Sequence, residues 1–231
     1  MEIPSLRRRK KRVNVSGIAG NFIDGVASIN ATVEPRAEFW DNWNRENIKA
    51  TGPLWVALGD SVTQGIGSSN PSTSYAALIL SRLKNRTGKA WRLINLSMSG
   101  ARLKDVTDLQ LKVMRALDLQ PNLVTAIIGS NDIMWRRNTR GITADAKLLI
   151  RSLPEGSYLS KVSRSKQQRR RKAISLAFET IAPENHIHLF NAWNWPTAEG
   201  MFAEDKFHPN DYAYEYIADN LWHSLYVNDF I

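Results

Sequence analysis

The most constraining feature of this 231-residue chain is an alternation between short apolar runs and segments of helical periodicity, which begins at residue 54. Residues 54–58 form an apolar run that ends at Gly59, and residues 123–128 form another that is rich in β-branched side chains and ends at Gly129. Both runs are typical of strands buried in a parallel sheet. Apolar residues recur at helical spacing over 75–83 and 103–117. Repeated βα units predict right-handed crossovers and a parallel sheet.

The same alternation continues to the C-terminus and predicts one α/β domain of three layers, with about five strands and helices on both faces of the sheet. The remaining strands are expected over 93–96, 158–162 and 186–190, and the remaining helices over 143–152, 165–182 and 210–226. A hydrophobic fraction of 43% and a charged fraction of 23% are ordinary for a globular protein. Neither an internal repeat nor a second domain is evident.

Four short blocks contain the candidate catalytic residues: Gly-Asp-Ser-Val-Thr-Gln-Gly at 59–65, Ser-Gly at 99–100, Gly-Ser-Asn-Asp at 129–132 and Asp-Lys-Phe-His-Pro at 205–209. The first three blocks follow the ends of expected strands. Ligand sites of doubly wound sheets lie outside the carboxyl ends of the strands, so these blocks are expected to converge. Together the four blocks supply a serine, hydrogen-bond donors, a histidine and a carboxylate, which are the groups that nucleophilic acyl transfer requires.

At these residues the chain resembles the SGNH (GDSL) hydrolase family, whose name lists its catalytic Ser, Gly, Asn and His. All four blocks are present in the family order, and they span residues 59–209. The resemblance implies a flavodoxin-like arrangement of about five parallel strands. It also implies an esterase, lipase or acylhydrolase that uses a serine nucleophile and needs no cofactor.

Ser61, Asp205 and His208 are the predicted catalytic residues. A neutral imidazole is the usual acceptor of a serine proton near neutral pH, which makes His208 the expected base. Asp205 lies three residues earlier, so its carboxylate can reach one ring nitrogen and leave the other facing Ser61. An Asp-x-x-His-Pro block closes the triad in the family that the chain resembles.

The resemblance assigns the oxyanion hole to the backbone N–H groups of Ser61 and Gly100 and to the side-chain amide of Asn131. Gly100 permits close approach because it has no Cβ, and an asparagine amide donates without titrating. Asp60 and Asp132 flank these residues and are expected to brace their loops through hydrogen bonds.

Three tryptophans and two histidines are weaker candidates. Trp135, Trp193 and Trp195 follow the third and fifth expected strands, and they either line the substrate pocket, since such pockets are largely apolar, or pack in the core. His186 and His188 alternate on an expected strand, but no third ligand is near them in sequence. No metal is therefore expected.

The net charge of +9 is concentrated in two runs, 7–12 and 164–172, which each contain six basic residues and no acidic one. These runs are expected to be a solvated tail and an exposed helix face, or weak contacts for an anionic surface, with no specific nucleic-acid partner. Residues 1–35 are polar and weakly periodic, which predicts a loosely ordered extension. The hydrolase domain is predicted over 36–231, beginning with a short helix over 36–48 that has an aromatic face.

The chain contains no cysteine, which excludes disulfides and thiolate chemistry. Asn14, Ser16 and Asn21 interrupt any apolar signal-peptide region, and no run reaches the roughly 18 apolar residues of a membrane span. A cytoplasmic protein is therefore expected.

These observations predict a single-domain serine hydrolase that cleaves a small-molecule carboxylic ester or thioester through an acyl-enzyme. The alternative from another class is a noncatalytic protein that binds nucleic acid or an anionic membrane through its basic segments on an SGNH scaffold.

Overall fold

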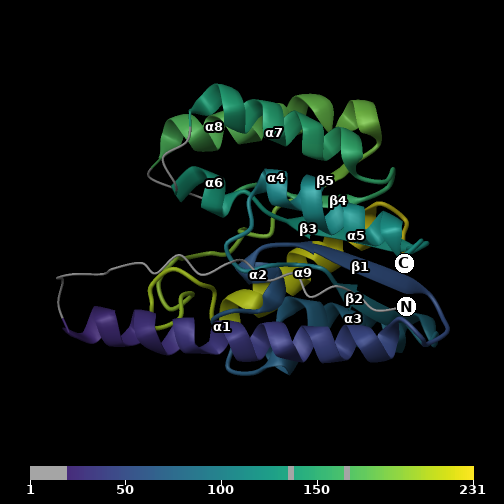
Figure 1. Ribbon diagram of the computed structural model, residues 1–231, viewed down its shortest axis with the longest axis horizontal. Helices are drawn as coiled ribbons and strands as arrows, with labels where there is room; N and C mark the ends of the chain where they lie inside the picture. Colours follow the sequence, from purple (N-terminus) through teal and green to yellow (C-terminus); the bar gives the residue numbers. More distant parts are fainter. Residues whose placement is uncertain (1–19, 135–137, 164–166) are drawn as a thin grey trace.

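The computed structural model describes residues 20–134, 138–163 and 167–231, in which five parallel strands form one sheet in the order β2-β1-β3-β4-β5 (Figure 1). The strands are β1 Leu54–Gly59, β2 Arg92–Asn95, β3 Leu123–Ile127, β4 Tyr158–Ser160 and β5 His188–Phe190. This strand order is that of flavodoxin-like folds. The predicted three-layer α/β architecture is confirmed.

The two faces of the sheet belong to different hydrophobic cores. In β1, Leu54, Val56 and Leu58 pack in one core. The alternate residues Trp55 and Ala57 pack in the other. Successive side chains of a strand point to opposite faces, so a strand buried on both sides must be apolar throughout. This requirement explains the uninterrupted apolar run in the sequence.

Helices cover both faces of the sheet. The core that contains Val56 is closed by α4 Leu103–Asp105, α5 Leu111–Ala116, α7 Thr139–Ser152 and α8 Gln168–Ile181. The core that contains Trp55 is closed by α1 Gly20–Asn47, α3 Tyr75–Thr87 and α9 Asp211–Val227. Two short helices follow strand ends directly, α2 Ser61–Gln64 after β1 and α6 Ser130–Met134 after β3. These two helices carry the serine and asparagine blocks.

The first helix corrects the prediction for residues 1–35. The helix expected over 36–48 begins at Gly20 and has 28 residues, so the segment from Gly20 to Pro35 is helical rather than loosely ordered. Its stability comes from tertiary packing, which a weak local pattern does not reveal. Ile29 packs with Ile66 and Ala203. The basic run 7–12 lies outside the described residues.

The second half of α1 covers the edge strand β2. The Asn44 amide donates to the Asn95 carbonyl at 2.7 Å and accepts from the Asn95 N–H at 2.8 Å. Trp43 Nε1 donates to the Leu93 carbonyl at 3.0 Å. An edge strand leaves backbone groups without partners, and these side chains supply the partners. The sheet is thereby closed at this edge by a helix instead of another strand.

Two further segments differ from the sequence predictions. The helix expected over 103–117 contains a π-helical turn, η2 Val106–Gln110, between α4 and α5. His186 has a left-handed backbone (φ +54°) and ends the 3₁₀ turn η3 Pro183–Asn185, so it does not alternate with His188 on one strand. Among the described helices, none combines the length and the apolar character required to cross a membrane.

The contact between α1 and β2 gives a test of the helix's contribution to stability. Asn44→Ala should lower the free energy of unfolding by about 1–3 kcal/mol, because it leaves two buried backbone groups of Asn95 without partners. Urea denaturation followed by circular dichroism measures this loss. Asn42→Ala, at an exposed position of the same helix, is the matched control and should change little. Equal losses in both variants would contradict a specific role for Asn44.

Candidate active site

The turn between β1 and α2 places Ser61 at the carboxyl edge of the sheet. Gly59 ends the strand with φ +146°, and a Cβ there would lie 2.3 Å from both the Ile127 carbonyl oxygen and Thr63 Oγ1. Only glycine therefore fits. The Asp60 carboxylate caps α2 by accepting from the Val62 N–H at 3.0 Å. Ser61 is consequently the first residue of the helix, where a backbone N–H has no intrahelical partner.

Gln110, which the sequence did not identify, holds the end of β1. Its Oε1 accepts from the Gly59 N–H at 2.8 Å, and its Nε2 donates to the Gly59 carbonyl at 2.7 Å. The side chain is fully buried and comes from the last residue of the π-helical turn. A glutamine within a helical pattern carries no sequence signal for such a contact.

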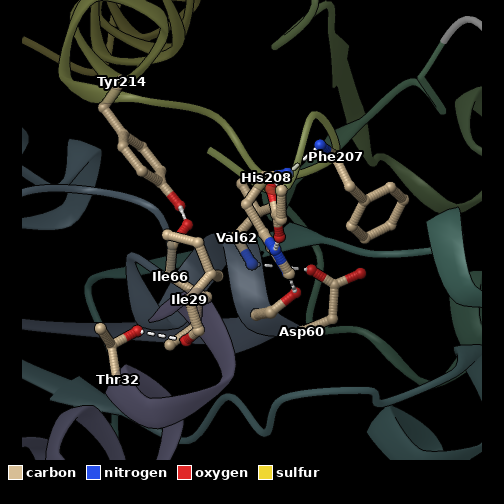
Figure 2. Close-up of polar contacts among 10 residues, drawn as sticks. Ile29, Thr32, Asp60, Val62, Ile66, Phe207, His208 and Tyr214 are labelled. Carbon is tan, nitrogen blue, oxygen red and sulfur yellow. Dashed lines mark hydrogen bonds and ion pairs between the residues drawn. The ribbon is translucent and has the colours of Figure 1, made fainter. Parts of the chain in front are cut away.

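His208 reaches the serine from a loop before α9. An antiparallel bridge between Phe202 and Pro209 and a 2.8 Å hydrogen bond from the Ala203 N–H to the His208 carbonyl close this loop. Figure 2 shows the His208 side chain extending toward the turn that carries Asp60 and Val62. In the same view, the Tyr214 hydroxyl of α9 donates to the Ile66 carbonyl at 2.8 Å. The elements on both sides of the site are thus tied to each other.

Hydrogen bonds connect Ser61 to His208 and His208 to Asp205. His208 Nε2 is 2.9 Å from Ser61 Oγ, and His208 Nδ1 is 2.6 Å from Asp205 Oδ2. The second oxygen of Asp205 accepts from the N–H groups of Phe207 and His208 at 3.0 Å each. The structure therefore brings together the three residues predicted from the sequence.

The two aspartates of the site differ in their electrostatics. Burial alone would raise the pKa of Asp205, but the hydrogen bond and charge of His208 and two backbone N–H groups together lower it below its ordinary value. Burial, with a smaller contribution from the charge of Asp132, raises the pKa of Asp60 to about 7, although the hydrogen bond from the Val62 N–H opposes the shift. Asp205 is thus the carboxylate that stays ionised beside the imidazole, and Asp60 is a helix cap.

Asn131 and Gly100 lie in two neighbouring segments. Asn131, on α6, lines the same cavity as Ser61, and its Nδ2 donates to the Ala101 carbonyl at 3.0 Å. Gly100 adjoins Ala101 with a left-handed backbone (φ +75°) but is not among the described residues that line the cavity. Asp132 braces the start of α4, because it accepts from the Leu103 N–H at 2.9 Å.

Beside these residues lies a largely apolar cavity of about 600 Å³. Trp193 and Trp195 line it with ring centroids 5.6 Å apart, and Trp195 packs edge-on against Phe202. Trp135, the third predicted tryptophan, lies outside the described residues. Met134 and Phe207 also line the cavity, with exposed fractions of 55% and 41%, and the sequence did not identify them. Across the described ranges, no group of three or more His, Cys, Asp or Glu residues is placed to hold a metal ion.

Comparison with known proteins identifies the family. The sequence model of the GDSL-like Lipase/Acylhydrolase family matches residues 57–216. The chain belongs to this family. It is therefore an ester hydrolase of the GDSL type. No curated protein sequence matches it.

Solved structures of similar fold include two esterases and TesA. TesA is 21% identical with a TM-score of 0.62, over 74% of this chain and 97% of that one. The psychrotrophic esterase EstA from Pseudoalteromonas sp. is also 21% identical with a TM-score of 0.62, over 76% and 98%. An Axe2 variant, an acetyl-xylooligosaccharide esterase from Geobacillus Stearmophilus, is 18% identical with a TM-score of 0.58, over 76% and 95%. At these identities the likeness concerns the fold.

Proposed function

We propose that this GDSL-family hydrolase cleaves a carboxylic ester or thioester through an acyl-enzyme formed on Ser61. The observation that carries the proposal is the chain of hydrogen bonds from Ser61 Oγ through His208 to Asp205, at 2.9 and 2.6 Å. As Ser61 Oγ attacks the carbonyl carbon, His208 Nε2 takes its proton. The imidazolium then protonates the leaving alcohol or thiol as the bond from the acyl carbon to that group breaks.

In the second half of the reaction, water is the nucleophile and Ser61 Oγ is the leaving group. Water attacks the acyl carbon of the Ser61 ester while His208 accepts the proton of the water. The acid is released when the bond to Ser61 Oγ breaks and the proton returns to the serine. The lowered pKa of Asp205 supports an ionised carboxylate at Nδ1 throughout, which fixes the tautomer of His208 and stabilises the imidazolium.

The oxyanion of the tetrahedral intermediate needs donors placed before the reaction begins. We assign this role to the N–H of Ser61, the N–H of Gly100 and the amide of Asn131. Two observations support the assignment. Ser61 occupies the first position of α2, and Asn131 has a second amide hydrogen besides the one that contacts Ala101.

The substrate that fits this site is a small ester or thioester with an apolar or aromatic part. The cavity volume of about 600 Å³ lies within the range of about 300–1,000 Å³ for small-molecule sites. Trp193, Trp195 and Phe202 offer flat apolar surfaces to one end of such a molecule. The proposed steps use only backbone and side-chain groups of this chain and water.

The direct test of the proposal is the removal of the serine hydroxyl. Ser61→Ala should reduce the hydrolysis of p-nitrophenyl butyrate by about 10⁴-fold or more, as the loss of a nucleophile does in other serine hydrolases. Ser130→Ala is the matched control, since Ser130 also lines the cavity, and it should keep its rate within a few-fold. If both variants stay folded and Ser61→Ala retains turnover, the assigned mechanism is wrong. A wild-type chain inactive on a panel of esters would favour the noncatalytic alternative.

Asn131 gives a second test, because its amide meets the substrate oxygen mainly after charge has developed there. Asn131→Ala should lower kcat by about 10²–10³-fold with little change in KM. Asn131→Asp should be at least as damaging, since it puts a carboxylate where a donor is needed. Steady-state kinetics at matched thermal stability separate the two parameters. A large rise in KM at unchanged kcat would assign Asn131 to substrate binding instead.

A further inference from the structure

The outer surface of α7 and α8 carries an excess of positive charge. Together the two helices contain seven basic residues and two acidic ones. The side chains that define this surface, called the α7–α8 face below, are Arg140, Leu148 and Arg151 on α7 and Arg169, Lys172 and Leu176 on α8, and all six are exposed.

These six residues form two adjacent stripes. The α7 positions 140, 148 and 151 and the α8 positions 169, 172 and 176 each recur at the spacing of one helix face. The two helices pack against each other and form an outer layer over α4 and α6 (Figure 1). One continuous surface therefore presents both stripes to the outside of the molecule.

The positive charge of this surface is not neutralised within the described chain. None of the seven basic residues of α7 and α8 forms an ion pair with a described acidic residue. Three of them, Arg169, Arg170 and Arg171, lie at the start of α8, whose first turn contains no acidic residue. The helix dipole is positive at this end, so it repels the three arginines, which also repel one another. An external anion bound here would relieve this repulsion.

Two exposed leucines favour lipid over nucleic acid as that anion. Leu148 is 49% exposed and Leu176 is 68% exposed, and both stand among the basic side chains of the face. Basic residues mixed with large apolar ones on one helix surface are typical of binding to anionic membranes, where the apolar side chains enter the headgroup region. Contacts to a phosphate backbone would gain nothing from leucines.

The α7–α8 face also adjoins the mouth of the cavity. Gln167, which precedes α8, lines the cavity, and Arg170 donates to the carbonyl of the cavity residue Ile133 at 2.8 Å. The exposed side chains of Met134 and Phe207 lie on the same cavity. We propose that the α7–α8 face binds an anionic lipid surface and thereby places the mouth of the cavity beside the lipid. The binding does not depend on the proposed catalytic mechanism.

Sedimentation of the full chain with lipid vesicles tests this proposal. The wild type should bind vesicles of phosphatidylcholine with 30% phosphatidylglycerol and should bind pure phosphatidylcholine at least tenfold more weakly. Arg169→Glu/Lys172→Glu should weaken binding to the anionic vesicles at least tenfold, since each substitution replaces an attraction to the anionic surface by a repulsion. Arg86→Glu/Lys89→Glu makes the same change of charge at two exposed positions, one in the last turn of α3 and one just after the helix, and it should alter binding by less than twofold.

The Leu176→Ser variant distinguishes binding to a lipid surface from binding to other anions. It should weaken binding to anionic vesicles severalfold. Inorganic phosphate at 10 mM should not displace the chain from the vesicles. Equal losses in the two double variants, displacement by phosphate, or tighter binding to a DNA duplex that is unaffected by Leu176→Ser would each overturn the proposal.

Binding and catalysis are tested independently of each other. Hydrolysis of soluble p-nitrophenyl butyrate should be unchanged in Arg169→Glu/Lys172→Glu, and Ser61→Ala should bind vesicles like the wild type. A failure of the catalytic mechanism is therefore distinguished from a failure of lipid binding.

Discussion

The site depends on the close approach of the backbone of β1 to that of β3 at Gly59. The strand β1 ends so near β3 that any Cβ at Gly59 would lie 2.3 Å from the Ile127 carbonyl oxygen. Gln110 then occupies both hydrogen-bonding groups of the same glycine. With the strand end fixed in this way, α2 begins at Ser61, and the serine Oγ lies 2.9 Å from His208 Nε2. Preorganisation of this kind is what lets a hydrogen-bonded site act without rearrangement.

The support of α2 extends beyond the segment that the family model matches, residues 57–216. Trp40 of α1 donates to the carbonyl of Gln64, the last residue of α2, at 2.9 Å. Arg36 binds the hydroxyl and carbonyl of Ser68 at 3.1 Å each. A Cβ on Gly25 would lie 2.6 Å from the carbonyl oxygen of Glu204, next to Asp205. The first helix thus contacts the segments that carry both the serine and the aspartate.

Sequence predicted those parts of the fold that local chemistry determines. The strands were found because burial on both faces requires apolar residues throughout, and Ser61, Asp205 and His208 because their blocks follow one another in the family order. The first half of α1 was missed since packing against distant residues, such as that of Ile29 against Ile66 and Ala203, rather than periodicity, stabilises it. Gln110 was missed for a similar reason. Its partner is 51 residues away, and nothing in the local sequence marks it.

The most direct measurement of the central claim is the mass-spectrometric mapping of a covalent fluorophosphonate adduct. The phosphorus of such a reagent takes the place of the acyl carbon, so the residue that attacks it is the nucleophile. The hydrogen bond of 2.9 Å between His208 Nε2 and Ser61 Oγ predicts one adduct per chain, on the peptide that contains Ser61. An adduct on another serine instead of Ser61, or ester hydrolysis that continues in an enzyme fully modified at Ser61, would contradict it.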